Sequence, residues 1–257
     1  MDLEHTDTGT EKALKTATYA GELMLVSGAE ASRVEDTVRR ILLNFGFTDA
    51  QVFVMPGMLV VTVESGSLVS KTVVKRISGG TPHLGKMSMV NALSRELATH
   101  SMSIDEFRRR LEEISNVPSY KDWVMIVAAG TGSFAFTYII NADIAASFAS
   151  LFVGSFVYAV TKLLRRHNVS RVLVNVLAGL LCIVTANFVI SLSGMPLLPE
   201  MVVFGSIIPH LPGVSLVSSM RDIMQGDLVS GSIGLVDVLA VAGSLAAGVL
   251  VGYSFLI

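Results

Sequence analysis

The chain has 257 residues, of which 51% are hydrophobic and 16% are charged, and its formal net charge is −2. An average soluble chain carries about 25% charged residues, so this composition is typical of a protein that lies partly in lipid. The small net charge, without a basic stripe, argues against nucleic acid as a partner. The single cysteine, Cys182, excludes an internal disulfide and a cysteine-rich metal site.

Charged residues are concentrated in the first part of the chain. Residues 1–122 contain 14 of the 19 Lys and Arg residues and 16 of the 21 Asp and Glu residues. Ionisable groups are sparse wherever a chain crosses hydrocarbon. The asymmetry predicts a soluble α+β domain over residues 1–120 and a transmembrane domain over residues 121–257. The acidic, polar N-terminus does not resemble a signal peptide, so we expect the first domain to be cytoplasmic.

The first domain is expected to contain four helices and three short strands. Apolar residues recur at helical spacing in four segments, residues 13–24, 34–45, 89–97 and 107–114. Ser103 and Glu106 form a capping box before the last of these helices. Between the second and third helices the pattern changes to that of strands, at residues 52–54, 59–63 and 69–77.

The second domain contains segments that are long and apolar enough to cross a membrane. Four of them hold about 18 to 21 residues each, which suffices for the roughly 30 Å hydrocarbon core at 1.5 Å per residue. They are residues 123–140, 144–164, 172–192 and 236–256. A further segment, residues 201–225, is interrupted by Pro209, Pro212 and Gly213. The sequence therefore predicts a polytopic α-helical domain of about five transmembrane helices, the fourth of them broken.

The loop charges predict the orientation in the membrane. Lys162, Arg165, Arg166 and Arg171 lie in one loop and are four of the five positive charges in this half. By the positive-inside rule this loop is cytoplasmic. We therefore expect a multi-pass protein of the plasma membrane with the N-terminal domain inside and the C-terminus outside.

The broken segment is the strongest candidate for a functional site. Irregular backbone inside the membrane is tolerated only where protein buries it or where it lines a wet cavity. In transporters, half-helix ends at such breaks bind polar solutes. We therefore expect His210, Pro212, Gly213 and Ser215 to line a substrate or ion pathway, with His210 as a proton relay. The alternative for the break is a proline kink that binds no ligand. The alternative for His210 is a structural hydrogen bond to a carbonyl group.

Other polar residues of the second half are weaker candidates. Asp237 lies about two turns into the last helix and is our first choice as the proton-coupling group, unless it reaches the cytoplasmic interface. Asn187 could line the pathway, although membrane asparagines more often join helices. Three residues are expected at the cytoplasmic rim: Arg221, Asp222 and Asp227. Gly248 and Gly252 have the spacing that lets two helices pack closely.

Motifs for catalysis are absent from the sequence. It contains no G-x-x-x-x-G-K-[ST], H-E-x-x-H or G-x-S-x-G pattern, which argues against an ATP-driven pump. Glu35 and Asp36 could perform acid–base chemistry or bind a cation, but such a run is more often the solvated face of a helix. We expect no catalytic residues, no metal site and no cofactor.

Several short runs resemble one known family. In the first domain they are Gly28-Ala-Glu-Ala-Ser-Arg33-Val-Glu-Asp36, Arg76-Ile-x-Gly-Gly80-Thr and Asn91-x-Leu-x-Arg95-Glu-Leu. In the second they are Leu211-Pro-Gly213, Arg221-Asp222, Gly226-Asp227 and Gly231. In this order, over nearly the whole chain, they resemble the threonine/serine exporter family.

The resemblance implies secondary, proton-driven export of small amino acids from the cytoplasm. Long members of the family have about ten membrane helices, so this chain resembles the larger member of a split pair. Its expected partners are a small polar substrate, the lipid bilayer, and either a second small membrane subunit or further copies of itself. Some split relatives are thought to export dicarboxylates such as succinate. The alternatives from other classes are a membrane-anchored enzyme with a catalytic N-terminal domain and a receptor-like regulator.

Overall fold

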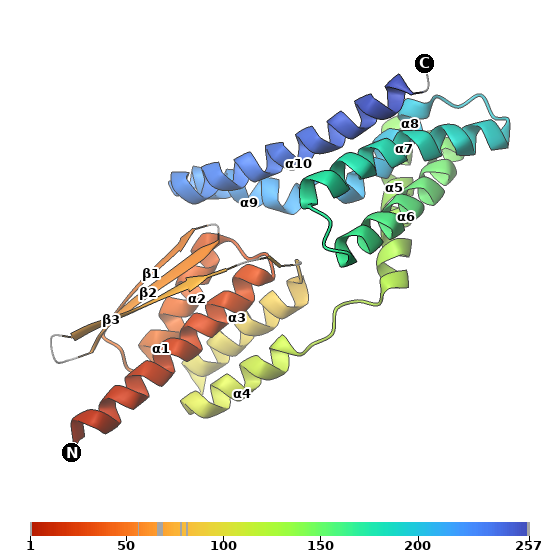
Figure 1. Ribbon diagram of the computed structural model, residues 1–257. Coiled ribbons are helices and arrows are strands. Elements are labelled where there is room, and N and C mark those ends of the chain that lie inside the picture. The colour runs from red at the N-terminus through yellow and green to blue at the C-terminus, as the bar shows by residue number, and fades with distance from the viewer. Residues whose placement is uncertain (1, 56, 66–68, 78, 81, 256–257) are drawn as a thin grey trace. The chain divides into compact units, whose positions relative to one another are not determined.

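The computed structural model describes residues 2–55, 57–65, 69–77, 79–80 and 82–255. The chain is mostly helical, with one small three-stranded sheet (Figure 1). It divides into two compact units. The first unit comprises Met1–Ser119 and Val217–Gly234, and the second comprises Tyr120–Leu216 and Leu235–Ile257.

The first unit contains the four helices and three strands that the sequence predicts before residue 118. The helices are α1 (Asp2–Val26), α2 (Ala31–Asn44), α3 (Leu84–Thr99) and α4 (Ile104–Ser115). The strands are β1 (Asp49–Met55), β2 (Met58–Ser65) and β3 (Val69–Arg76), which lie between α2 and α3 in the sequence. The predicted change from helical to strand periodicity is therefore confirmed.

The sheet is antiparallel in the order β1-β2-β3, and only one of its faces carries the core. Leu59, Val61 and Val63 alternate along the central strand and are buried, as a period of two requires for one inward face. α1 and α2 pack on this face, and α3 and α4 contact α1 or α2 in turn (Figure 1). Gly21 allows the close approach of α1, because a Cβ atom there would meet the side chains of Leu59 and Val38.

The helices of this unit follow from their apolar faces and their caps. In α2 the buried residues Val34, Val38 and Ile41 recur at helical spacing. α4 begins at the predicted capping residue, since Ser103 Oγ accepts a hydrogen bond from the Glu106 N–H at 3.2 Å. Phe107 of α4 then packs edge-on against Phe45, with 5.6 Å between the ring centroids.

Two later helices contribute to the first unit, namely most of α9 (Gly213–Met224) and the start of α10 (Leu228–Ser254). α10 begins at Leu228, whereas the sequence predicted a start at residue 236. The reason is a cap: Asp227 Oδ1 accepts a hydrogen bond from the Ser230 N–H at 3.1 Å. The small residues that follow are polar enough to resemble a loop but are compatible with a helix.

The second unit contains α5 (Asp122–Asn141), α6 (Ile144–Arg166), α7 (Arg171–Ser193), α8 (Pro199–Ile207), the 3₁₀ turn η1 (Ile208–His210) and most of α10. Four helices, α5, α6, α7 and α10, are long and apolar enough to cross a membrane. A fifth span is formed if α8 and η1 are joined to α9 across a 64° bend. Four of the predicted spans are therefore confirmed in length and composition, and the bend lies in the segment that the sequence predicts to be broken.

Small residues allow the helices of the second unit to pack closely. A Cβ atom on Gly248 would meet the backbone of Val176 in α7, and one on Gly252 would meet Ile183 in the same helix. The predicted packing role of this glycine pair is confirmed. Gly179 faces α10 from the opposite side, since its Cβ would meet the Leu245 carbonyl.

Candidate functional site

The candidate site is the break between α8 and α9, which the two prolines explain. Pro209 has no N–H to continue the hydrogen-bond ladder of α8, so the helix tightens into η1 and ends at His210. Leu211 is then extended, with φ −73° and ψ 137°, as expected before Pro212. α9 starts at Gly213 in a new direction, at 64° to the preceding helix.

His210 lies at this break and is buried, with 8% of its surface exposed. Its Nε2 is 3.2 Å from Thr161 Oγ1 of α6, and its ring packs against Tyr158 one turn earlier. Its Nδ1 has no hydrogen-bond partner of normal geometry among the described residues. The imidazole thus has one nitrogen bound to a hydroxyl group and the other available.

A line of buried hydroxyl groups joins α5, α6 and α8. Thr137 of α5 donates to Ser150 Oγ of α6 at 2.6 Å. Ser206 of α8 donates to the Val202 carbonyl at 2.8 Å and lies 3.4 Å from the Ser150 carbonyl. A Cβ atom on Gly205 would meet Thr137 Oγ1, so α8 approaches α5 closely here. This line of hydroxyl groups was not predicted from the sequence, although hydroxyl residues at helical spacing within apolar segments could have indicated it.

Asp237 lies in a different environment from His210. Its side chain is half exposed and forms an ion pair with Arg171, with 2.9 Å between Oδ1 and Nη1. Arg171 is the first residue of α7, at the end of the positively charged segment, so the pair fits the alternative that Asp237 lies near the interface. No hydrogen bond or ion pair in the described part of the chain joins Asp237 to His210.

The other predicted pathway residues have separate surroundings. Asn187 is half-buried, and its amide donates to the Ile183 carbonyl one turn back in α7 at 3.0 Å. Gly213 and Ser215 are exposed at the start of α9, and Pro212 is half-buried beside them. The structure therefore brings Pro212, Gly213 and Ser215 to the break with His210, and it gives Asn187 a bond within its own helix.

The three predicted rim residues all belong to the first unit. Arg221 forms an ion pair with Glu30, and Asp227 caps α10. Asp222 is buried, and its Oδ1 has no hydrogen-bond partner within the described residues. The ion pair of Arg221 with Glu30 joins segments that are far apart in the sequence, so local patterns could not predict it.

Glu35 lies close to these acids. Its Oε1 accepts a hydrogen bond from the Val54 N–H at 2.8 Å. Partial burial raises the pKa of Glu35 above its ordinary value, and the nearby charges of Asp227, Asp36 and Asp222 raise it further, against the effect of the Val54 bond. Among the described residues, no group of three or more His, Cys, Asp or Glu residues is arranged to hold a metal ion.

Comparison with known proteins agrees with this architecture. Residues 15–256 match the threonine/serine exporter family. The threonine/serine exporter of Corynebacterium glutamicum is 21% identical over 245 residues, which are 93% of this chain and 50% of that protein. The chain thus spans about half the length of the curated relative it matches. No solved structure matches the chain. The family match covers nearly every residue and includes all the apolar helices, so this multi-pass membrane protein belongs to the threonine/serine exporter family.

Proposed function

We propose that the chain is a subunit of a secondary transporter that exports threonine and serine from the cytoplasm. The observation that carries this proposal is the broken span, where a buried histidine lies beside interrupted backbone. Such breaks offer free backbone groups to a small polar solute inside the membrane. The Corynebacterium glutamicum relative is a threonine/serine exporter, which supports the same substrates. Residues 1–120 form the cytoplasmic domain in this proposal, and residues 121–257 form the membrane domain.

We propose protons as the coupling ion and His210 as the coupling group. A coupling group must change its charge as the site faces each side of the membrane, and histidine does so near neutral pH. Among the described residues, Nδ1 of His210 has no hydrogen-bond partner of normal geometry, so this nitrogen can take a proton without breaking the contact of Nε2 with Thr161. Asp237 ranks second, because it is half exposed and forms an ion pair with Arg171.

We propose that the transport unit contains a second small membrane subunit or a second copy of this chain. Leu211, whose backbone is extended, and the first residues of α9, Gly213 to Ser215, are exposed in the isolated chain, directly at the break. Irregular backbone at membrane depth cannot face lipid, so protein or water must cover it. An additional membrane protein would supply that cover and leave a wet path for the substrate.

Two alternatives differ from this proposal in a measurable way. Export of dicarboxylates such as succinate would use the same break, and competition between substrates distinguishes it. A membrane-anchored enzyme would have no use for an interrupted helix, and membership in an exporter family favours transport over catalysis.

The proposal can be tested by substrate protection at the break. Ser215→Cys places a thiol at an exposed position beside Gly213, and Cys182→Ala removes the native thiol. We expect threonine and serine to slow the labelling of this cysteine in membranes, and succinate to have no effect. Gly243→Cys in α10, where nothing lies within 4 Å of a Cβ atom, is the control that threonine should not protect. Protection by succinate alone would favour the dicarboxylate alternative, and equal labelling with and without all three would contradict a substrate site at the break.

A further inference from the structure

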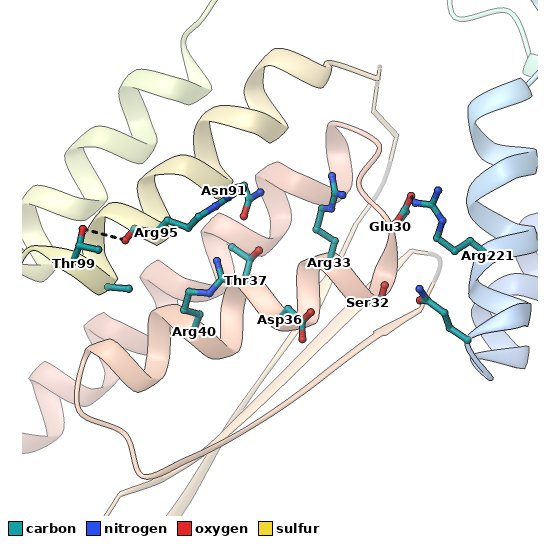
Figure 2. Close-up of a pocket in the computed structure, with 12 residues that line it drawn as sticks. Glu30, Ser32, Arg33, Asp36, Thr37, Arg40, Asn91, Arg95, Thr99 and Arg221 are labelled. Carbon is teal, nitrogen blue, oxygen red and sulfur yellow. Dashed lines mark hydrogen bonds and ion pairs between the residues drawn. The ribbon is translucent and has the colours of Figure 1, made fainter.

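A groove of about 880 Å³ lies in the first unit, between α2 and α3 and beside α9 (Figure 2). Its charged lining consists of four arginines and two carboxylates, and the rest of its lining is neutral. These charged residues are Arg33, Arg40, Arg95, Arg221, Glu30 and Asp36. The groove therefore has an excess of positive charge, whereas the whole chain carries a net charge of −2.

Helical spacing explains why the arginines converge. Arg33, Thr37 and Arg40 recur at intervals of four and three residues, so they share one face of α2. Asn91 and Arg95 are four residues apart and share one face of α3. Both faces border the same groove, and Figure 2 shows these side chains between the two helices.

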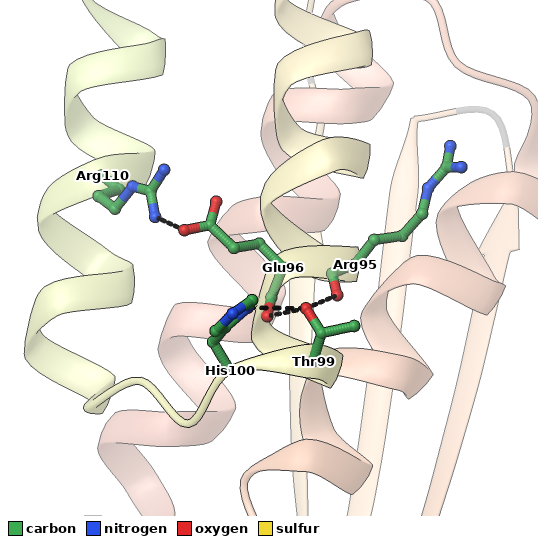
Figure 3. Close-up of polar contacts among 5 residues, drawn as sticks. All are labelled: Arg95, Glu96, Thr99, His100 and Arg110. Atoms are coloured by element: carbon green, nitrogen blue, oxygen red, sulfur yellow. Dashed lines mark hydrogen bonds and ion pairs between the residues drawn. The ribbon is translucent and has the colours of Figure 1, made fainter.

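The groove arginines differ from those of α4 in their partners. Arg108 and Arg109 of α4 pair with Glu112 and Glu113 at 2.8 and 2.7 Å. Arg110 pairs with Glu96 of α3, and Figure 3 shows Glu96 and Arg95 leaving α3 on opposite sides.

Of the four groove arginines, Arg221 is paired with Glu30, and the other three lack such carboxylate partners among the described residues. Among the described residues, Arg33 and Arg95 form no ion pair. Arg40 donates only to the Ser94 hydroxyl, at 3.2 Å. Three guanidinium groups thus border one groove without a bound negative charge.

We propose that this groove binds a small organic anion that carries at least two carboxylate or phosphate groups. Guanidinium groups bind both kinds of oxyanion through two parallel hydrogen bonds, and they keep their charge at all physiological pH values. One anionic group engages Arg33 and Arg40 of α2, and a second engages Arg95 of α3. The neutral side chains of Thr37 and Asn91 supply further hydrogen bonds between them.

A zwitterionic amino acid fits this groove less well than a dianion. Its single carboxylate would leave guanidinium groups unused, and its ammonium group would need a carboxylate partner. Glu30 is already paired with Arg221, so among the charged residues of the groove Asp36 is one carboxylate against the three guanidinium groups of Arg33, Arg40 and Arg95. The groove is therefore a site for a ligand other than threonine or serine.

The ion pair of Glu30 with Arg221 connects the groove to α9. Arg221 borders the groove from α9, the helix that follows the break, and Glu30 immediately precedes α2. A bound anion competes with Glu30 for Arg221. Occupancy of the groove thus changes how α9 is held to the rest of the first unit.

The proposal is tested by binding, without any measurement of transport. Succinate and inorganic pyrophosphate are titrated separately into the purified chain, and the heat of binding is measured. The buffer contains about 0.15 M salt, because salt at this concentration screens weak electrostatic attraction to the protein surface. We expect at least one probe to bind with a stoichiometry of one. The double variant R33Q/R95Q should weaken that binding by about tenfold or more, since it removes two charge-assisted contacts.

Two further variants control for overall charge and for folding. R109Q removes an arginine of α4 outside the groove and should leave the binding constant within about twofold of that of the wild type. E30Q releases Arg221 and should tighten binding by about threefold, a gain that a damaged fold cannot produce.

Three results would overturn the proposal. They are no binding of either probe to the wild-type chain, equal weakening by R109Q and R33Q/R95Q, and threonine binding that depends on Arg33 and Arg95. The preferred probe identifies the ligand as a carboxylate or a phosphate. Since no flux is measured, failure here leaves the transport proposal intact.

Discussion

At the scale of single residues, His210 and Asp237 have surroundings that suit different tasks. His210 is buried, and its Nδ1 has no hydrogen-bond partner of normal geometry in the described part of the chain, whereas Asp237 is half exposed and paired with Arg171. A group that shuttles protons needs a stable neutral form and access to a donor. We propose the histidine for this task, because its burial disfavours a permanent charge, whereas the aspartate is paired with a cation.

The first prediction concerns these two groups. His210→Gln keeps the hydrogen bond to Thr161 but cannot titrate, so we expect threonine efflux driven by a pH gradient to fall by about tenfold or more. Exchange of threonine for threonine should continue. Asp237→Asn should retain more than about half of the pH-driven efflux, because an exposed ion pair contributes little. The reverse result would identify Asp237 as the coupling group.

The second prediction concerns Glu35, whose pKa is raised mainly by burial above the ordinary value of 4.5. Its contribution to stability is fully present below that ordinary value and is lost as the pH rises through the higher value in the folded protein. Glu35→Gln retains an acceptor for the Val54 N–H and has no charge to bury. We expect its thermal midpoint to exceed that of the wild type by about 1–3 °C at about pH 7.5 and to equal it at about pH 4.

Thermal scans at the two pH values check this prediction. Glu64→Gln, at an exposed position of β2, is the matched control and should change neither midpoint. A lower midpoint for Glu35→Gln at about pH 7.5 would show that the carboxylate stabilises the fold in its charged form.

At the scale of elements, close helix packing depends on where a glycine faces backbone. Gly248 of α10 lies against the backbone of Val176 and Leu180 in α7, whereas Gly243 of the same helix has nothing within 4 Å of a Cβ atom. Backbone cannot move aside as a flexible side chain can, so an added methyl group pushes the two helices apart.

The third prediction follows from that difference. Gly248→Ala should cost about 1–3 kcal/mol and lower the thermal midpoint, because it forces α7 and α10 apart. Gly243→Ala should leave the midpoint equal or slightly higher, since alanine favours the helix by up to about 1 kcal/mol. This prediction is tested by measuring the thermal midpoints of the two purified variants in detergent. Equal midpoints would contradict the packing role of Gly248.

The elements also show what the sequence could and could not predict. Periodicity located the helices and strands, and the prolines located the break, because both signals are local. The predicted start of α10 at residue 236 was wrong, because the cap by Asp227 starts the helix at Leu228 although the composition there resembles that of a loop. The hydroxyl line of Thr137, Ser150 and Ser206 and the groove arginines depend on contacts between distant segments, which local patterns do not contain.

At the scale of the whole molecule, the orientation in the membrane stays a prediction from the loop charges. Single cysteines in a Cys182→Ala background test it with an impermeant thiol reagent. We expect cysteines at Ala142 and Met195, which follow α5 and α7, to react from outside in sealed cells, and one at His167 in the charged loop to react only after lysis. Labelling of His167→Cys in sealed cells would reverse the orientation.

Export of threonine and serine by an assembly that contains this chain is the central claim, and flux measures it most directly. The chain is reconstituted into liposomes alone and with any small membrane protein that copurifies with it, and labelled threonine, serine and succinate are followed under an imposed pH gradient. We expect threonine and serine to move against their gradients, faster than succinate, and only in vesicles where the chain is oligomeric or has its partner. Absence of threonine and serine flux in both preparations, with folded protein present, would contradict the account.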